Sequence, residues 1–172
     1  MVTQRGATRP LLLVIAAATL LAGTLDILDA FTFWGVTKAV PPERILQSIA
    51  SGLLGKAAFQ GGTGAAALGL LLHYFIMSVM AAVYVLAARR LLVLVRRPLL
   101  MGLAYGAATY VVMNYVVLPL SAVGPASAFA WPRFINNLGA HLVLVGIPLA
   151  LVARWGQGQA GQGTPTPTAD AI

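Results

Sequence analysis

Cysteine is absent from this 172-residue chain, and acidic residues are nearly so. Without a thiol, the chain has no disulfide, no thiolate nucleophile, no cysteine-ligated iron–sulfur cluster and no covalently attached c-type haem. Only four residues are Asp or Glu. Charged residues make up 9% of the chain and hydrophobic residues 59%, whereas soluble domains contain about 25% charged residues. The composition therefore excludes a soluble domain of appreciable size and indicates an integral membrane protein.

Four stretches contain no Asp, Glu, Lys or Arg. They are residues 10–25, 57–88, 98–132 and 134–153. A helix needs roughly 20 largely apolar residues to cross the hydrocarbon core of a membrane. The last three stretches meet this requirement directly, and the first meets it if Asp26 and Asp29 lie within the helix. The sequence therefore predicts an all-α fold, a four-helix transmembrane bundle in contact with the lipid bilayer.

We expect a single transmembrane domain at residues 1–155. Its four spans should lie at about residues 10–33, 63–88, 99–120 and 134–155. Between the first two spans, residues 43–59 form an amphipathic pattern in which Ile45, Ile49 and Leu53 recur at intervals of four. We interpret it as a helix that lies in the membrane interface or re-enters the membrane. Residues 156–172 are rich in Gly, Gln, Thr and Pro, which predicts a disordered cytoplasmic tail.

Basic residues divide unequally between the two sides of this topology. Seven fall on the side of the termini: Arg5, Arg9, Arg89, Arg90, Arg96, Arg97 and Arg154. Four fall on the other side: Lys38, Arg44, Lys56 and Arg133. This asymmetry places both termini in the cytoplasm. Although the net charge is +7, no basic stripe alternates with stacking aromatic residues, so a nucleic-acid partner is not expected.

Seven polar or ionisable side chains lie inside the apolar stretches. They are Asp26, Asp29, His73, Asn114, Asn136, Asn137 and His141. At about 1.5 Å per residue, they lie roughly 20 to 30 Å from the arginines that flank their helices. Since the hydrocarbon core is about 30 Å thick, all seven fall in its outer half. Such groups are costly in hydrocarbon and face a bundle interior or a cavity, so they are the candidate site.

Helical spacing brings some of these groups onto common faces. Asp26 and Asp29 are three residues apart, and Asn137 and His141 are four apart. Two carboxylates one turn apart in a low dielectric repel each other and are poorly solvated; a proton, a nearby imidazole or a bound cation relieves this. Two alternatives stay open. The Asn and His side chains are interhelical hydrogen-bonding groups worth about 1 kcal/mol each, or Asp29 reaches the outer headgroup region.

Motifs for catalysis are missing. The two histidines are not in an HExxH arrangement and no serine lies in a nucleophile elbow, so we predict no enzyme activity, no catalytic residue and no metal site. The third span carries Gly102 and Gly106, a spacing that lets two helices pack closely.

Short motifs between about residues 68 and 155 resemble a known family. They are His73 with Ser78 and Tyr84, Gly102-Leu103-Ala104-Tyr105-Gly106, Pro119-Leu120, and Gly139-Ala140-His141-Leu142-Val143. On these residues, the stretch from about 68 to 155 resembles the YagU-like family of bacterial inner-membrane proteins. The helix with Asp26 and Asp29, and residues 41–62, depart from that family. The resemblance implies a multi-span protein of the bacterial inner membrane and supplies no activity.

Three functional hypotheses follow from these observations. In the first, the polar cluster binds or passes a proton, a cation or a small solute, and transport requires that the four-span chain forms a homo-oligomer. In the second, the chain is a structural or assembly subunit of a membrane complex. In the third, His73 and His141 ligate a b-type haem, because they lie at similar depth on different helices.

Overall fold

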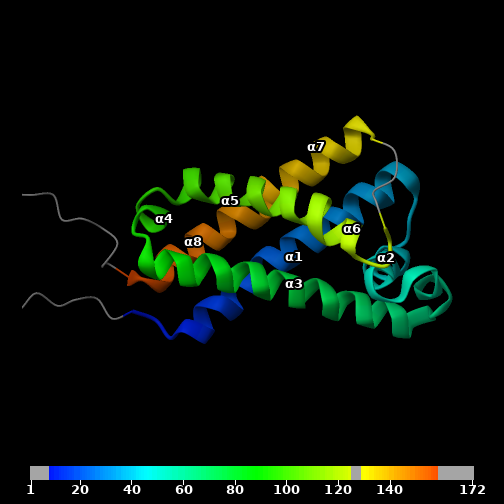
Figure 1. Cartoon of the computed structure of the whole chain (residues 1–172), viewed down its shortest axis with the longest axis horizontal. Coiled ribbons are helices and arrows are strands. Elements are labelled where there is room, and N and C mark those ends of the chain that lie inside the picture. The colour runs from blue at the N-terminus through cyan, green and yellow to red at the C-terminus, as the bar shows by residue number, and fades with distance from the viewer. Residues whose placement is uncertain (1–7, 125–128, 159–172) are drawn as a thin grey trace, which may run out of the picture.

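Four long helical segments run along the longest axis of the computed structural model, which describes residues 8–124 and 129–158 (Figure 1). The segments are α1 (Leu11–Lys38), α3 (Gly62–Arg90), the continuous α5–η2–α6 (Pro98–Val112, Met113–Val117 and Leu118–Leu120), and the continuous α7–η3–α8 (Trp131–Gly139, Ala140–Gly146 and Ile147–Gly156). Each is long and apolar enough to cross a membrane. The prediction of an all-α four-helix membrane bundle is confirmed.

Three short elements lie at the two ends of the bundle. α2 (Pro42–Leu54) and the 3₁₀-helix η1 (Gly55–Gln60) connect α1 to α3 at one end, and α4 (Val93–Arg96) connects α3 to α5 at the other. Both ends of the described chain lie at the α4 end (Figure 1). The amphipathic stretch expected as one helix is thus two elements, because Gly55 has φ +58°, a left-handed conformation that ends α2.

Two spans extend at one end by three residues or more beyond the expected bounds. α1 continues to Lys38, five residues beyond the predicted end, because nothing stops the helix before the left-handed Ala39 and the prolines that follow. α7 begins at Trp131 rather than at residue 134, since a proline at position 132 is tolerated in a first helical turn. Of the predicted tail, residues 159–172 lie outside the described residues.

Wide π-helical turns interrupt the third and fourth spans. η2 contains Tyr115, which lies four residues before Pro119, and η3 contains Leu144, which lies four residues before Pro148. The carbonyls of Tyr115 and Leu144 therefore lack the usual helical hydrogen bond from the residue four positions later. Proline has no N–H to donate and its ring clashes with the carbonyl four residues earlier, so the helix widens there. Both widened turns carry residues of the predicted polar cluster.

The hydrophobic core occupies the half of the bundle toward α4. Its largest fully buried side chains are Tyr84, Leu149, Val14, Val95 and Val145. Glycines let the third and fourth spans meet backbone to backbone. A Cβ at Gly102 would lie 2.8 Å from the carbonyl oxygen of Gly146, and one at Gly106 would overlap the backbone of His141.

Basic residues gather at both ends. At the α4 end, the Arg9 amide donates to the Gly156 carbonyl at 2.9 Å, and the Arg9 guanidinium lies 3.9 Å from the centre of the Trp155 ring. Arg89 also donates to the Arg9 carbonyl at 3.2 Å. The arginines predicted on the side of the termini therefore lie at this end, as far as the structure describes them. Lys38, Arg44, Lys56 and Arg133, predicted on the other side, belong to elements at the α2 end.

Candidate functional site

All seven predicted polar residues lie beyond the apolar core, toward the α2 end. α1 carries Asp26 and Asp29, α3 carries His73, η2 carries Asn114, α7 carries Asn136 and Asn137, and η3 carries His141. His73 is buried and the other six are half-buried, so none projects fully into the surrounding lipid. The four spans thus contribute to one polar region.

Side-chain amides connect the fourth span to two others. Asn136 Nδ2 donates to Asp29 Oδ2 at 2.8 Å, which joins α7 to α1. Asn137 Nδ2 donates to Asn114 Oδ1 at 3.4 Å, which joins α7 to η2. Asn114 in turn donates to the Tyr110 carbonyl at 2.9 Å. The asparagines therefore fix the position of one carboxylate and of the widened turn.

Each histidine has one ring nitrogen against a carbonyl. His73 Nε2 lies 2.8 Å from the Gly23 carbonyl oxygen, and His141 Nδ1 lies 2.9 Å from that of Asn137. Because a carbonyl only accepts, these nitrogens carry protons. In the neutral rings, His73 Nδ1 and His141 Nε2 are then the basic nitrogens. Each imidazole is held in one orientation while keeping one nitrogen able to take up a proton.

Asp26 is the central charged group. It interacts electrostatically with His141, His73 and Asp29. Among the described residues, no three His, Asp or Glu side chains are arranged to hold a metal ion. Asp26 is thus the acidic group that interacts with both imidazoles.

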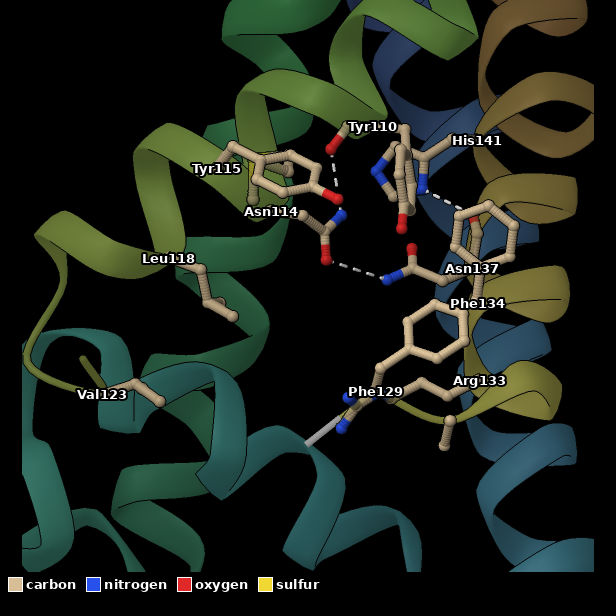
Figure 2. Close-up of a pocket in the computed structure, with 12 residues that line it drawn as sticks. Tyr110, Asn114, Tyr115, Leu118, Val123, Phe129, Arg133, Phe134, Asn137 and His141 are labelled. Carbon is tan, nitrogen blue, oxygen red and sulfur yellow. Dashed lines mark hydrogen bonds between the residues drawn. The ribbon is translucent and has the colours of Figure 1, made fainter. Parts of the chain in front are cut away.

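Three cavities meet at this cluster, and His141 lines them all. One of 260 Å³ lies between Asp26 and His73, and one of 200 Å³ lies among Asp26, Asp29, Asn136 and Asn137. The third, of 650 Å³, separates η2 from α7; Figure 2 shows Asn114 and Asn137 pointing toward one another across it. The cavities lie on one side of the packed core, so the polar region faces the α2 end.

The sequence did not place two of the cavity residues. Trp34 lines both smaller cavities, and Arg133 lines the 200 Å³ and 650 Å³ cavities. Each lies one residue outside its predicted span, at 10–33 and 134–155, because both helices were predicted too short. With the correct bounds, Trp34 follows Asp26 at two intervals of four residues, and Arg133 precedes Asn137 by four, so helical periodicity would have found them.

α2 supplies a further wall that the sequence did not predict. Ile45, Ser48 and Ile49 line the 260 Å³ cavity. α2 is held against α3 by Gln47, which is buried and donates to the Gly62 carbonyl at 3.1 Å. This helix therefore covers the Asp26–His73 cavity at the end of the bundle.

Comparison with protein-family models, with curated proteins and with solved structures finds no match to this chain. The resemblance of residues 68–155 to the YagU-like family stays a prediction from short motifs. It gives His73 and His141 no role, so the contacts and cavities are the basis for assigning one.

Proposed function

We propose that this multi-pass membrane protein binds a proton or a small hydrogen-bonding solute in its outer-half polar region. One observation carries the proposal. Four spans place seven polar side chains around cavities that meet at His141, on one side of a packed apolar core. Side chains that served only to join helices would leave no such space between them.

The groups at the site suit a proton or an uncharged polar ligand. Asp26 lies near two imidazoles that each keep one basic nitrogen. Asp29 already accepts a hydrogen bond from Asn136. A solute that fits the two smaller cavities has to be small, since their volumes are 260 and 200 Å³.

The packed core favours binding over passage. Toward α4, the bundle interior is filled by Val14, Ala18, Tyr84, Val145 and Leu149, each less than 2% exposed. The three cavities lie on the α2 side of this layer, and of its five residues only Val145 lines one of them. Transport would require the layer to open, or an assembly of several copies to enclose a path.

The location we propose is the bacterial inner membrane, with both termini in the cytoplasm. The structure groups the arginines that flank α1, α3, α5 and α8 at the α4 end, and excess positive charge marks the cytoplasmic side. The resemblance to the YagU-like family supports the same membrane. The polar region then opens toward the periplasm.

Trp34 provides the test, because it lines both cavities that Asp26 lines. Replacing Trp131 and Trp155 with Phe leaves Trp34 as the only tryptophan. We expect its fluorescence in lipid nanodiscs to change between about pH 3 and pH 9, the range that covers the ordinary pKa values of Asp and His. Substitution of both Asp26 and Asp29 with Asn should remove the carboxyl part of this change.

Glu43 is the matched control, since it is the other acidic residue at this end and lies exposed on α2. In the same Trp34-only background, Glu43→Gln should leave the transition unchanged. An unaltered transition in the Asp26→Asn, Asp29→Asn protein would defeat the proposal.

A second candidate, a subunit of a membrane assembly, has one observation in its favour. Of the most apolar 18 residues of the third span, 17% are buried inside the protein, against 33% in each of the other three spans. Its outer face is therefore available to another copy or another protein. Subunit counting in native-like nanodiscs tests this, and a strict monomer that captures no partner would exclude it.

A further inference from the structure

The 650 Å³ cavity between the third and fourth spans is larger than the proposed site needs. We propose that it binds an anionic membrane phospholipid, with the lipid phosphate at Arg133 and the first part of an acyl chain along the aromatic wall. This inference goes beyond the proposed function, and it does not depend on whether Asp26 and Asp29 exchange protons.

The cavity wall suits an amphiphile. Eight of its twelve lining residues are apolar or aromatic. Tyr110 and Phe134 meet edge to face with ring centres 5.9 Å apart. Tyr115 and Phe129 also line the cavity and are 69% and 63% exposed, so the cavity opens sideways between the two spans. A lipid beside the bundle reaches this opening without entering water.

The charge of the wall selects an anion. Arg133 lines the cavity and no carboxylate does, and the sequence contains no Asp or Glu between Glu43 and Asp170. Asp26 and Asp29 line the neighbouring cavity, and Arg133, Asn137 and His141 form the boundary between the two. A guanidinium binds phosphate oxygens with two parallel hydrogen bonds, which makes arginine the side chain best suited to this headgroup.

The depth of Arg133 in the membrane also suits a phospholipid. Arg133 lies in the first turn of α7, at the outer end of the fourth span, next to Trp131. Tryptophan rings favour the level of the lipid headgroups. Trp131 also contacts Phe129 and Phe134 edge to face, with ring centres 5.1 and 5.9 Å apart. The guanidinium thus lies where lipid phosphates lie, and the cavity extends inward from it to His141 (Figure 2).

These features favour a lipid over a free anion. A free phosphate would need polar donors on several sides, whereas most of this wall is hydrocarbon and aromatic ring. A zwitterionic lipid offers the same acyl chains but carries a cation that the basic wall repels. The predicted preference is therefore for a net negative headgroup.

Intact-complex mass spectrometry of the detergent-purified protein tests the inference. The probe is an equimolar mixture of phosphatidylglycerol and phosphatidylcholine with identical acyl chains. We expect the wild-type protein to retain phosphatidylglycerol preferentially, and Arg133→Gln to lower that preference about tenfold, the effect of losing one charge-assisted contact. Lys38→Gln is the matched control, because Lys38 is an exposed cation at the same end that lines none of the three cavities.

A second variant tests the cavity without touching its charge. Ala130 is exposed and lines the opening, so Ala130→Trp fills it with little effect on the core. Retention of phosphatidylglycerol should fall in this variant while its circular dichroism stays helical. Equal retention by Arg133→Gln and Lys38→Gln, or full retention by Ala130→Trp, would overturn the inference. Displacement of the lipid by millimolar inorganic phosphate would overturn it in favour of a soluble anion.

Discussion

Gly106 links the packing of the bundle to the polar site, and its replacement with alanine is the sharpest test of the structure. An added Cβ would lie 2.7 Å from Leu142 Cα and 2.8 Å from the carbonyl carbon of His141. Both are backbone atoms, so neither can rotate away and α5 has to separate from η3. Overpacking of this kind costs about 1 to 3 kcal/mol, against about 0.5 to 1 kcal/mol gained by replacing a helical glycine. We expect a net loss of about 1 kcal/mol, with an upper limit of about 2.5 kcal/mol.

Gly139 offers a matched control on the same continuous helix as His141. A Cβ there meets nothing within 4 Å. Gly139→Ala should therefore stabilise the protein by about 0.5 to 1 kcal/mol through helix propensity alone. The assay is reversible unfolding in mixed micelles with increasing sodium dodecyl sulfate, followed by circular dichroism. The free energies of unfolding of the two variants should differ by about 2 kcal/mol.

The same substitution should also disturb the polar site. Because the Gly106 contact lies against the backbone of His141, moving α5 away from η3 shifts this imidazole relative to Asp26. The pH transition of Trp34 fluorescence should change in Gly106→Ala and stay the same in Gly139→Ala. Equal stability of the two alanine variants would refute the close α5–η3 contact and the position of His141 that depends on it.

Other predictions test separate parts of the structure. Asn136→Ala should cost about 1 kcal/mol of unfolding free energy, because it removes the 2.8 Å hydrogen bond to Asp29. Since the chain has no cysteine, Lys56→Cys and Arg90→Cys can be labelled singly in intact cells; a membrane-impermeant thiol reagent should modify the first and not the second. Purified protein should show no Soret band, because the 260 Å³ cavity that His73 and His141 both line is too small for a porphyrin, and a band would support the haem hypothesis.

Composition and helix geometry were sufficient for the coarse fold. Charge-free stretches predicted four spans, and counting residues from the flanking arginines predicted that the polar side chains lie at a common depth. That counting works because an α-helix has a fixed rise, so depth follows from sequence position alone. The structure brings Asp29 to Asn136 and Asn114 to Asn137 across different spans, as a shared depth requires.

The walls of the site were less predictable, for two physical reasons. Helix ends depend on local caps: α1 ends at a left-handed Ala39, which has no sequence signature, so Trp34 was not assigned to the cavity wall. Contacts between distant segments have no local pattern either. Gln47 looks like a solvent-facing residue of an amphipathic helix, yet it is buried because the Gly62 carbonyl accepts its hydrogen bond.

The two halves of the bundle differ in how tightly they are packed. Toward α4, Gly102 and Gly146 bring the third and fourth spans into backbone contact, and apolar side chains fill the interior. Toward α2, η2 and α6 of the third span lie across a 650 Å³ cavity from α7 of the fourth span. Opening the α4 half would break close contacts between backbones that have no flexible side chains to rearrange, whereas the cavities of the α2 half exist without such a change. A binding or sensing role therefore requires less rearrangement of this bundle than a transport cycle does.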